Sequence, residues 1–207
     1  MMKNLLFIVG LAACISSTAV ADDKVYRVPE AGVEIHNPHS LEKLDLANYN
    51  GKKESRNDSS AKGTSKSLII FKFSKGDDAI GAISVKYSKT FDRKKPLRYH
   101  LGKLVRSIKQ KDVHNIELES SYENTLIGGR KALYYKAVPS IDSTMDLGVK
   151  TEAHLYAFNH NNTIFYIQSG INVSDKLPVD EINAIFNEFE GIVKDTVNAI
   201  ILKDVLH

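Results

Sequence analysis

Hydrophobic and polar positions alternate, or gather in short apolar runs, over several segments that end near Gly, Asn, Pro or Ser. This pattern is typical of β-strands. It predicts two short extended pieces within residues 24–38, on either side of a Pro-Glu-Ala-Gly turn, and a hairpin formed by 68–73 and 80–87. Four further strands are predicted at 113–120, 131–138, 149–158 and 163–171.

Two other segments repeat their apolar residues at three- and four-residue spacing, which predicts helices with one buried face. The first begins at Pro96, whose missing N–H costs no hydrogen bond in a first turn, and ends near Lys111. The second follows Pro178 and continues to about Ile200. The predicted buried residues of the first helix are Leu97, Leu101, Leu104, Val105 and Ile108.

The order of these elements predicts a single α+β domain over residues 22–207, in which helices sandwich an antiparallel sheet. Residues 52–67 interrupt the pattern, because they contain no large apolar side chain. Such a segment buries too little surface to offset the entropy that ordering it would cost. We therefore predict a flexible surface loop at 52–67.

Four stretches together resemble the PsbP/DcrB-like fold family. They are the Gly32–Pro38 segment after an early turn, the Ile83–Tyr87 strand that leads to a helix, the Ile127–Ala132 hairpin entry and the Phe-containing C-terminal helix. The resemblance covers nearly all of the chain after residue 21. It implies helices packed on an antiparallel sheet and a non-enzymatic binding, accessory or chaperone-like role, although a fold does not determine a function.

The first 21 residues have the parts of an export signal. Lys3 precedes an apolar run from Leu5 to Ile15, and small residues then lead to an Ala-x-Ala site that ends at Ala21. This arrangement predicts a signal peptide over 1–21, cleavage after Ala21, and a periplasmic or secreted protein. The apolar run is too short to cross a bilayer as a permanent helix.

Leu11–Cys14 resembles the lipobox of bacterial lipoproteins, in which the cysteine is lipidated and becomes the first residue. Processing there would leave an apolar region of only about seven residues, so cleavage after Ala21 is the favoured prediction. A lipoprotein anchored at Cys14 stays open as the alternative. If Ala21 is the site, the exported chain contains no cysteine, which excludes disulfides and thiolate metal sites.

Charge is distributed unevenly, although the net charge of the chain is only +3. Residues 86–111 contain ten Lys or Arg and a single acid, Asp92, a balance of +9. Residues 112–207 contain seven basic and fourteen acidic side chains, a balance of −7. The first predicted helix is therefore both basic and amphipathic, and it has two interpretations: a solvated face or a docking surface.

As a docking surface, this basic segment would contact an acidic protein surface or an anionic envelope component. Export removes nucleic acid as a partner, and the oligomeric state is not predicted. The predicted partner-binding residues are Arg93, Lys94, Lys95, Arg98, Lys103, Arg106 and Lys109.

The chain contains no G-x-S-x-G, H-E-x-x-H, P-loop, dinucleotide Gly-rich turn or EF-hand loop. We therefore predict no catalytic residue, no cofactor and no metal. Glu152 and His154 share one face of a predicted strand and could in principle do acid–base chemistry. We favour a hydrated polar strand face, because no nucleophile lies beside them in the sequence.

These observations predict an exported non-enzymatic binding or accessory protein of the bacterial cell envelope, which docks an acidic partner through the basic segment 86–111. Toxin neutralisation and a chaperone-like role are two forms of such a function. The alternative is an envelope enzyme with an unrecognised site near Glu152 and His154. A concave site with converging polar groups would favour the enzyme, and a filled core with an exposed basic patch would favour the binding protein.

Overall fold

The fold is that of a computed structural model. The structure describes residues 25–28, 31–44, 66–88, 94–111, 123–137 and 148–204, although within these ranges no side chain is described at 66–68, 103 and 106–111. The predicted signal peptide, most of the predicted 52–67 loop, the predicted 113–120 strand and Arg93 lie outside the described residues.

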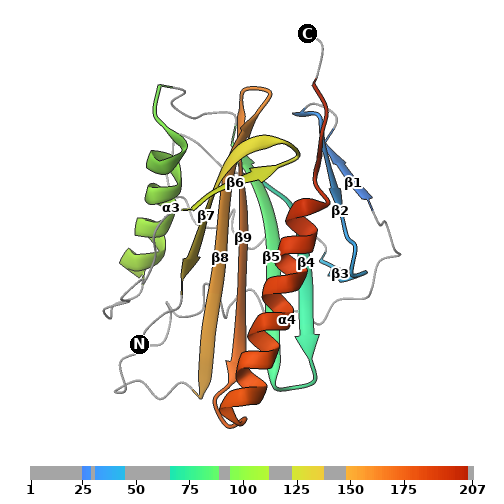
Figure 1. The fold of residues 1–207 in the computed structure, drawn as a ribbon, viewed down its shortest axis with the longest axis vertical. Coiled ribbons are helices and arrows are strands. Elements are labelled where there is room, and N and C mark those ends of the chain that lie inside the picture. Colours follow the sequence, from blue (N-terminus) through green and yellow to red (C-terminus); the bar gives the residue numbers. More distant parts are fainter. Residues whose placement is uncertain are drawn as a thin grey trace, which may run out of the picture.

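A seven-stranded antiparallel sheet is the largest unit of the described chain (Figure 1). Its strand order is β3-β4-β5-β9-β8-β7-β6. The strands are β3 (Glu42–Lys43), β4 (Lys66–Lys75), β5 (Ala79–Ser88), β6 (Glu123–Ile127), β7 (Arg130–Ala137), β8 (Val149–His160) and β9 (Thr163–Ser174).

Tight turns set the register of the sheet. Asn161 and Asn162 both have positive φ between β8 and β9, which Asn tolerates better than most residues. The turn pairs His160 with Thr163 and Asn159 with Ile164. Since side chains alternate across a strand, this register decides which residues of β8 face each side of the sheet.

A smaller sheet has the order β1-β2-β10. It joins β1 (Val25–Val28) and β2 (Val33–His36), the two extended pieces predicted within residues 24–38, to β10 (Ile201–Leu202) at the other end of the chain. Val33 and Ile35 are fully buried and belong to the main core. The two ends of the domain therefore pair with each other across 167 to 169 positions of the sequence, and no local sequence pattern reports such a contact.

Two helices pack on opposite faces of the seven-stranded sheet, α3 (Leu97–Lys111) and α4 (Val179–Asn198). Leu101 and Val105 of α3 pack against Tyr135, Leu155 and their neighbours on β7 and β8. On the other face α4 buries an apolar stripe against β5, β8 and β9. That stripe consists of Ile182, Ile185, Phe189, Ile192, Val193 and Val197.

Close approach fixes the position of α4 on the sheet. Gly81 of β5 lies beneath the helix, and a Cβ atom there would come within 3.0 Å of the Phe189 ring and 2.9 Å of the Gly170 backbone oxygen. Glycine is therefore required where the helix crosses β5. Phe189 also lies 5.4 Å, between ring centroids, from Phe73, in the middle of the main core.

The predicted fold class is wrong. The described chain is mostly β-strand, arranged in two antiparallel sheets with only two helices, so it is a β-rich fold and not an α+β sandwich. Each helix covers part of one face, and the second sheet completes the main core. The element order did not show the second sheet, because it pairs the two ends of the chain and because β3, β6 and β10 are too short or too polar to be recognised.

Most of the individual element predictions are confirmed. The hairpin of 68–73 and 80–87, both helices, and the strands at 131–138, 149–158 and 163–171 all occur with small shifts at their ends. The predicted loop 52–67 extends too far, since β4 begins at Lys66. The first two residues of β4, Lys66 and Ser67, pair with Tyr87 and Lys86 of β5.

Candidate functional site

The strand face that carries Glu152 and His154 is buried, which makes the prediction of a hydrated face wrong. His154 is fully buried and Glu152 is 5% exposed. Both side chains lie on the α4 side of β8, where the Phe189 ring centroid is 6.3 Å from that of His154. The prediction failed because Glu and His read as solvent-facing in a strand pattern, whereas here α4 covers their face.

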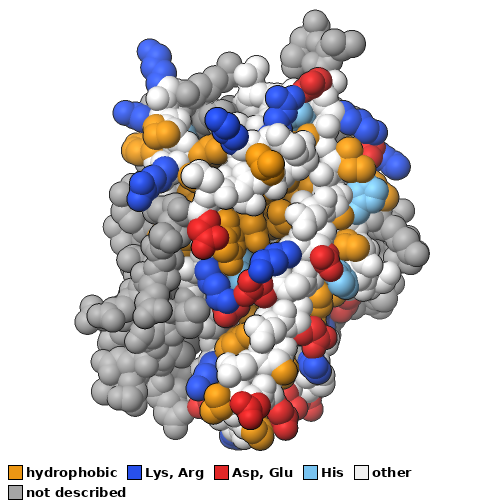
Figure 2. All heavy atoms as spheres, viewed as in Figure 1, with side chains coloured by type: hydrophobic (Ala, Val, Ile, Leu, Met, Phe, Trp, Pro, Cys, Tyr) orange, Lys and Arg blue, Asp and Glu red, His pale blue; other side chains and the backbone are white. Residues whose placement is uncertain are grey.

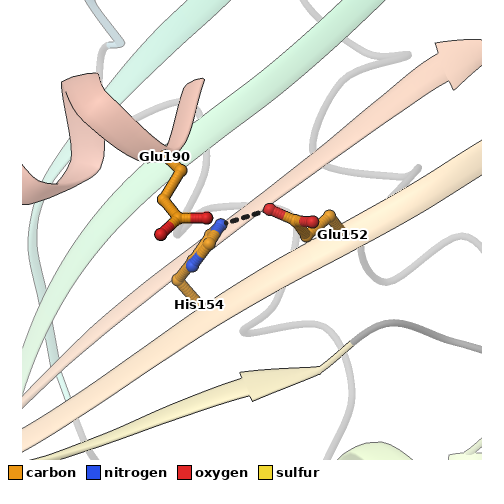
Figure 3. Close-up of side chains that lie close together, drawn as sticks. All are labelled: Glu152, His154 and Glu190. Atoms are coloured by element: carbon orange, nitrogen blue, oxygen red, sulfur yellow. Dashed lines mark ion pairs between the residues drawn. The ribbon is translucent and has the colours of Figure 1, made fainter. Parts of the chain in front are cut away.

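Figure 3 shows how three side chains converge: Glu152 and His154 from β8, and Glu190 from α4. One carboxylate or ring atom from each lies within 4.8 Å of the others. His154 Nε2 is 2.8 Å from Glu152 Oε1. These two atoms are in contact but do not meet the geometry of a hydrogen bond, and both are buried.

The other ring nitrogen of His154 has a clear partner. His154 Nδ1 lies 2.8 Å from the Tyr134 hydroxyl, in a hydrogen bond whose donor depends on the imidazole tautomer. Tyr134 is on β7, which pairs with β8 such that Lys136 is opposite His154. The two rings are stacked, with an interplanar angle of 12°. Tyr134 and the strand pairing together orient the imidazole toward Glu152.

Two lysines balance the two carboxylates. Lys136 Nζ donates to Glu190 Oε2 at 2.7 Å and lies 3.1 Å from Glu152 Oε2. Lys194, one turn along α4, lies 2.6 Å from Glu190 Oε1. Both lysines are partly exposed, with 36% and 55% of the side-chain surface accessible. The cluster is therefore buried at His154 and exposed to solvent at Lys194.

These contacts shift the pKa values of the partly exposed members. Burial of Glu190 would raise its pKa, but hydrogen bonds from Lys136 and Lys194 outweigh it and lower the pKa to about 2. Burial would likewise lower the pKa of Lys136, and the two carboxylates outweigh it and raise that pKa. Burial, with Tyr156 and the carboxylates nearby, raises the pKa of Tyr134, so the phenol stays protonated.

The sequence pointed to Glu152 and His154 but missed the other members of this cluster. Tyr134 was predicted to pack in the sheet, and Lys136, Glu190 and Lys194 were not singled out at all. A correct β7–β8 register would have placed Tyr134 and Lys136 beside His154. Nothing local in the sequence places Glu190 there, because that contact depends on how α4 crosses the sheet.

The predicted partner-binding residues lie on the opposite side of the sheet, on and before α3. Lys94, Lys95 and Arg98 are exposed. The backbone of α3 contains positions 103, 106 and 109, but the side chains of Lys103, Arg106 and Lys109 lie outside what the structure describes. In Figure 2, Lys and Arg side chains lie around the start of α3 and across the upper part of the face shown, whereas Asp and Glu side chains lie mostly over α4.

The start of α3 combines charge with an exposed aromatic ring. Lys95 Nζ lies 5.6 Å from the centroid of the Tyr99 ring, and Tyr99 is 37% exposed. The first turn of α3 contains no acidic residue. Helix N-termini favour acidic side chains, so the basic residues there gain nothing from the helix dipole.

The remaining described histidines do not assemble into a site with one another. His39 contacts Asp195 of α4 at 2.8 Å, and His36 lies 4.0 Å from Glu34. His160 Nε2 lies 2.9 Å from the backbone oxygen of Lys203 and helps to hold the C-terminal segment. None of these contacts brings two of these histidines together.

A comparison with protein-family models and with characterised proteins finds no match. Among solved structures, the chain is similar to the crystal structure of a protein of unknown function, PA94 from Pseudomonas aeruginosa, at 11% identity and a TM-score of 0.47. The match covers 87% of this chain and 97% of that one. Similarity at this level does not establish a common fold, and the resemblance to the PsbP/DcrB-like family stays a prediction.

Within the described residues, neither helix has the length and apolar character that a membrane-spanning helix needs.

Proposed function

We propose that this protein is an exported, non-enzymatic binding or accessory protein of the bacterial cell envelope, which docks an acidic partner protein through the basic segment 86–111. The observation that carries the proposal is the exposed basic start of α3. Lys94, Lys95 and Arg98 lie there together, and α3 turns its apolar residues, Leu101 and Val105, toward the sheet.

Physical chemistry supports a contact role for these side chains. Basic side chains at and just before a helix N-terminus gain no stabilisation from the helix dipole. Arg and Tyr are the residue types that dominate the energy of many interfaces, and Arg98 and Tyr99 are neighbours here. A positive surface also speeds encounter with an acidic partner at low salt.

The burial of Glu152 and His154, the candidate enzyme site, also favours a binding protein over an enzyme. An enzyme site at Glu152 and His154 would need access for a substrate, yet the imidazole is fully buried beneath α4. Both carboxylates of the cluster are also occupied by lysines. Acid–base chemistry on a substrate would require α4 to move away from the core that Phe189 anchors.

The test is binding of a fluorescent poly-glutamate peptide, used as the probe for an acidic protein surface. The full chain should bind it at low salt, and the triple variant Lys94→Glu, Lys95→Glu, Arg98→Glu should lose at least tenfold in affinity. The matched control reverses three exposed lysines elsewhere, Lys131, Lys150 and Lys176. Equal loss in both triple variants would show an effect of net charge alone and would overturn the proposal.

Anionic lipid vesicles make the second arm of the experiment. If the α3 variant lost binding to vesicles containing phosphatidylglycerol but kept binding to the peptide, the surface would serve a membrane and not an acidic protein. Affinity capture from an envelope extract would then identify the partner, with the α3 triple variant as the negative control. A partner retained equally by that variant would contradict docking through α3.

A further inference from the structure

The buried cluster on the α4 side has a property that ion pairing with the lysines does not explain. Each carboxylate interacts with a lysine through Oε2, but Glu152 Oε1 faces His154 Nε2 with no hydrogen bond between them. Both residues are more than nine-tenths buried. A buried acceptor without a partner is costly, so such atoms call for a cation or a proton between them.

The Tyr134 hydroxyl can accept a hydrogen bond from His154 Nδ1 or donate one to it, and only the first arrangement makes a metal site. When His154 Nδ1 carries the proton and donates it to the Tyr134 oxygen, 2.8 Å away, Nε2 presents a lone pair toward Glu152 Oε1. Two lone pairs then face each other at 2.8 Å. That separation is close to the roughly 2.9 Å between two neighbouring ligands of an octahedral ion at about 2.0–2.1 Å, whereas two ligands of a tetrahedral ion would have to lie about 0.5 Å further apart.

The third ligand comes from α4. A carboxylate oxygen of Glu190 lies within 4.8 Å of the other two ligand atoms. Both of its oxygens contact lysines, Oε2 with Lys136 and Oε1 with Lys194. Lys194 is the more exposed of the two and can leave for solvent, which frees Oε1 at little cost because surface ion pairs contribute about 0–1 kcal/mol.

From this geometry we propose that Glu152, His154 and Glu190 bind a divalent transition-metal ion of the zinc class, with Tyr134 as the residue that orients the imidazole. One nitrogen and two oxygens suit zinc and its first-row neighbours, whereas magnesium and calcium prefer oxygen ligands alone. At such sites the ring nitrogen of the histidine that does not bind the metal usually donates a hydrogen bond to a neighbouring group, as His154 Nδ1 would to Tyr134. This site is independent of the α3 surface and departs from the sequence-based prediction of no metal.

The position of the site suggests what the ion does. It joins β8 to α4 at the point where Phe189 packs on His154, and it neutralises charge that Lys136 and Lys194 otherwise balance. A metal ion there would stabilise the packing of α4 on the sheet. We therefore expect a structural or regulatory site, in which Lys136 and the metal compete for Glu190.

The experiment titrates metal-stripped full chain with Co²⁺, whose visible absorption reports its ligands. One ion should bind per chain, and Zn²⁺ should displace it. Glu152→Gln and Glu190→Gln should each weaken binding at least tenfold, and Tyr134→Phe should weaken it about 10–100-fold. His39→Gln is the matched control, because His39 also contacts a carboxylate of α4 but lies outside the cluster.

The variant Lys136→Met tests whether Lys136 competes with the metal ion for the two carboxylates. It removes the competing ammonium from Glu190 and Glu152, so Co²⁺ should bind several-fold more tightly than to the native chain. Circular dichroism confirms that each variant is folded, and Glu190→Gln, on the exposed side of the cluster, keeps the test available if Glu152→Gln does not fold. Absence of stoichiometric binding, binding retained in Glu190→Gln, or weaker binding to Lys136→Met would each overturn the proposal.

Discussion

The two polar regions of this protein lie on opposite faces of the same strand pair, β7 and β8, and differ in burial and in the mix of charges that they contain. Beneath α4, acidic and basic side chains pair with one another around a buried imidazole. At the start of α3, Lys94, Lys95 and Arg98 lie exposed, with the same sign of charge and without an acid in the first turn. The first region is largely buried, and the second lies on the surface.

This difference shows that the presence of a charged residue in the sequence does not establish that its side chain is exposed. Glu152 and Lys94 both read as surface residues, yet the first is almost wholly buried and the second exposed. A buried charge must have partners, so removing one member has a large effect. An exposed charge is screened by water and salt, so its removal changes association more than stability.

The largest effect is expected where α4 meets the cluster. Phe189→Ala removes a fully buried ring that contacts both Phe73 and His154, and it should lower the free energy of unfolding by about 3–5 kcal/mol. Chemical denaturation measures this directly. A loss below about 1 kcal/mol would mean that the cavity collapses, or that α4 is held mainly by other contacts.

Loss of Lys136 should come next. Lys136→Ala leaves the buried Glu152 carboxylate without its lysine, and we expect a loss of about 1–3 kcal/mol in the free energy of unfolding, moderated by the exposure of Lys136. Lys150→Ala, an exposed lysine of β8, is the control and should change little. The double variant Lys136→Ala, Glu152→Gln should recover part of the loss, since a neutral amide needs no counter-charge.

Lowering the pH should remove the stabilisation that Glu190 gives to the fold within a defined pH range. The pKa of Glu190 is lowered to about 2 in the folded chain, against an ordinary value of 4.5. The carboxylate therefore stabilises the fold fully above about pH 4.5, and that contribution, about 1 kcal/mol because solvent screens these partly exposed groups, disappears as the pH falls toward 2. Denaturation of the native chain and Glu190→Gln at several pH values should give curves that converge in this range. If the difference in the free energy of unfolding between the two proteins stayed constant over this pH range, the lowered pKa of Glu190 would be contradicted.

The smallest effect on stability is expected at the start of α3. Reversal of Lys94, Lys95 and Arg98 should change the free energy of unfolding by no more than about 0.5 kcal/mol per site. Thermal unfolding of the triple variant measures it. A larger destabilisation would show that these side chains are needed for folding, and the contrast between the two regions would then fail.

Most secondary structure was predictable because its signals are local. The apolar spacing in α3 and α4, and the asparagines at 159, 161 and 162, predict helices and a turn without any knowledge of the fold. The strands β3, β6 and β10 carry weaker signals. They form because a neighbouring strand offers unpaired backbone groups, which is a property of the assembled sheet.

By itself, the sequence determined the periodic elements, the polarity of charge between residues 86–111 and 112–207, and the shared strand face of Glu152 and His154. Tertiary structure decided the fold class and the character of that face. A strand pattern reports which residues lie on the same side, but not what covers that side. The packing of α4 converted a predicted hydrated face into a buried one and added Glu190 to it, because a contact across 36 residues depends on how two elements cross in space.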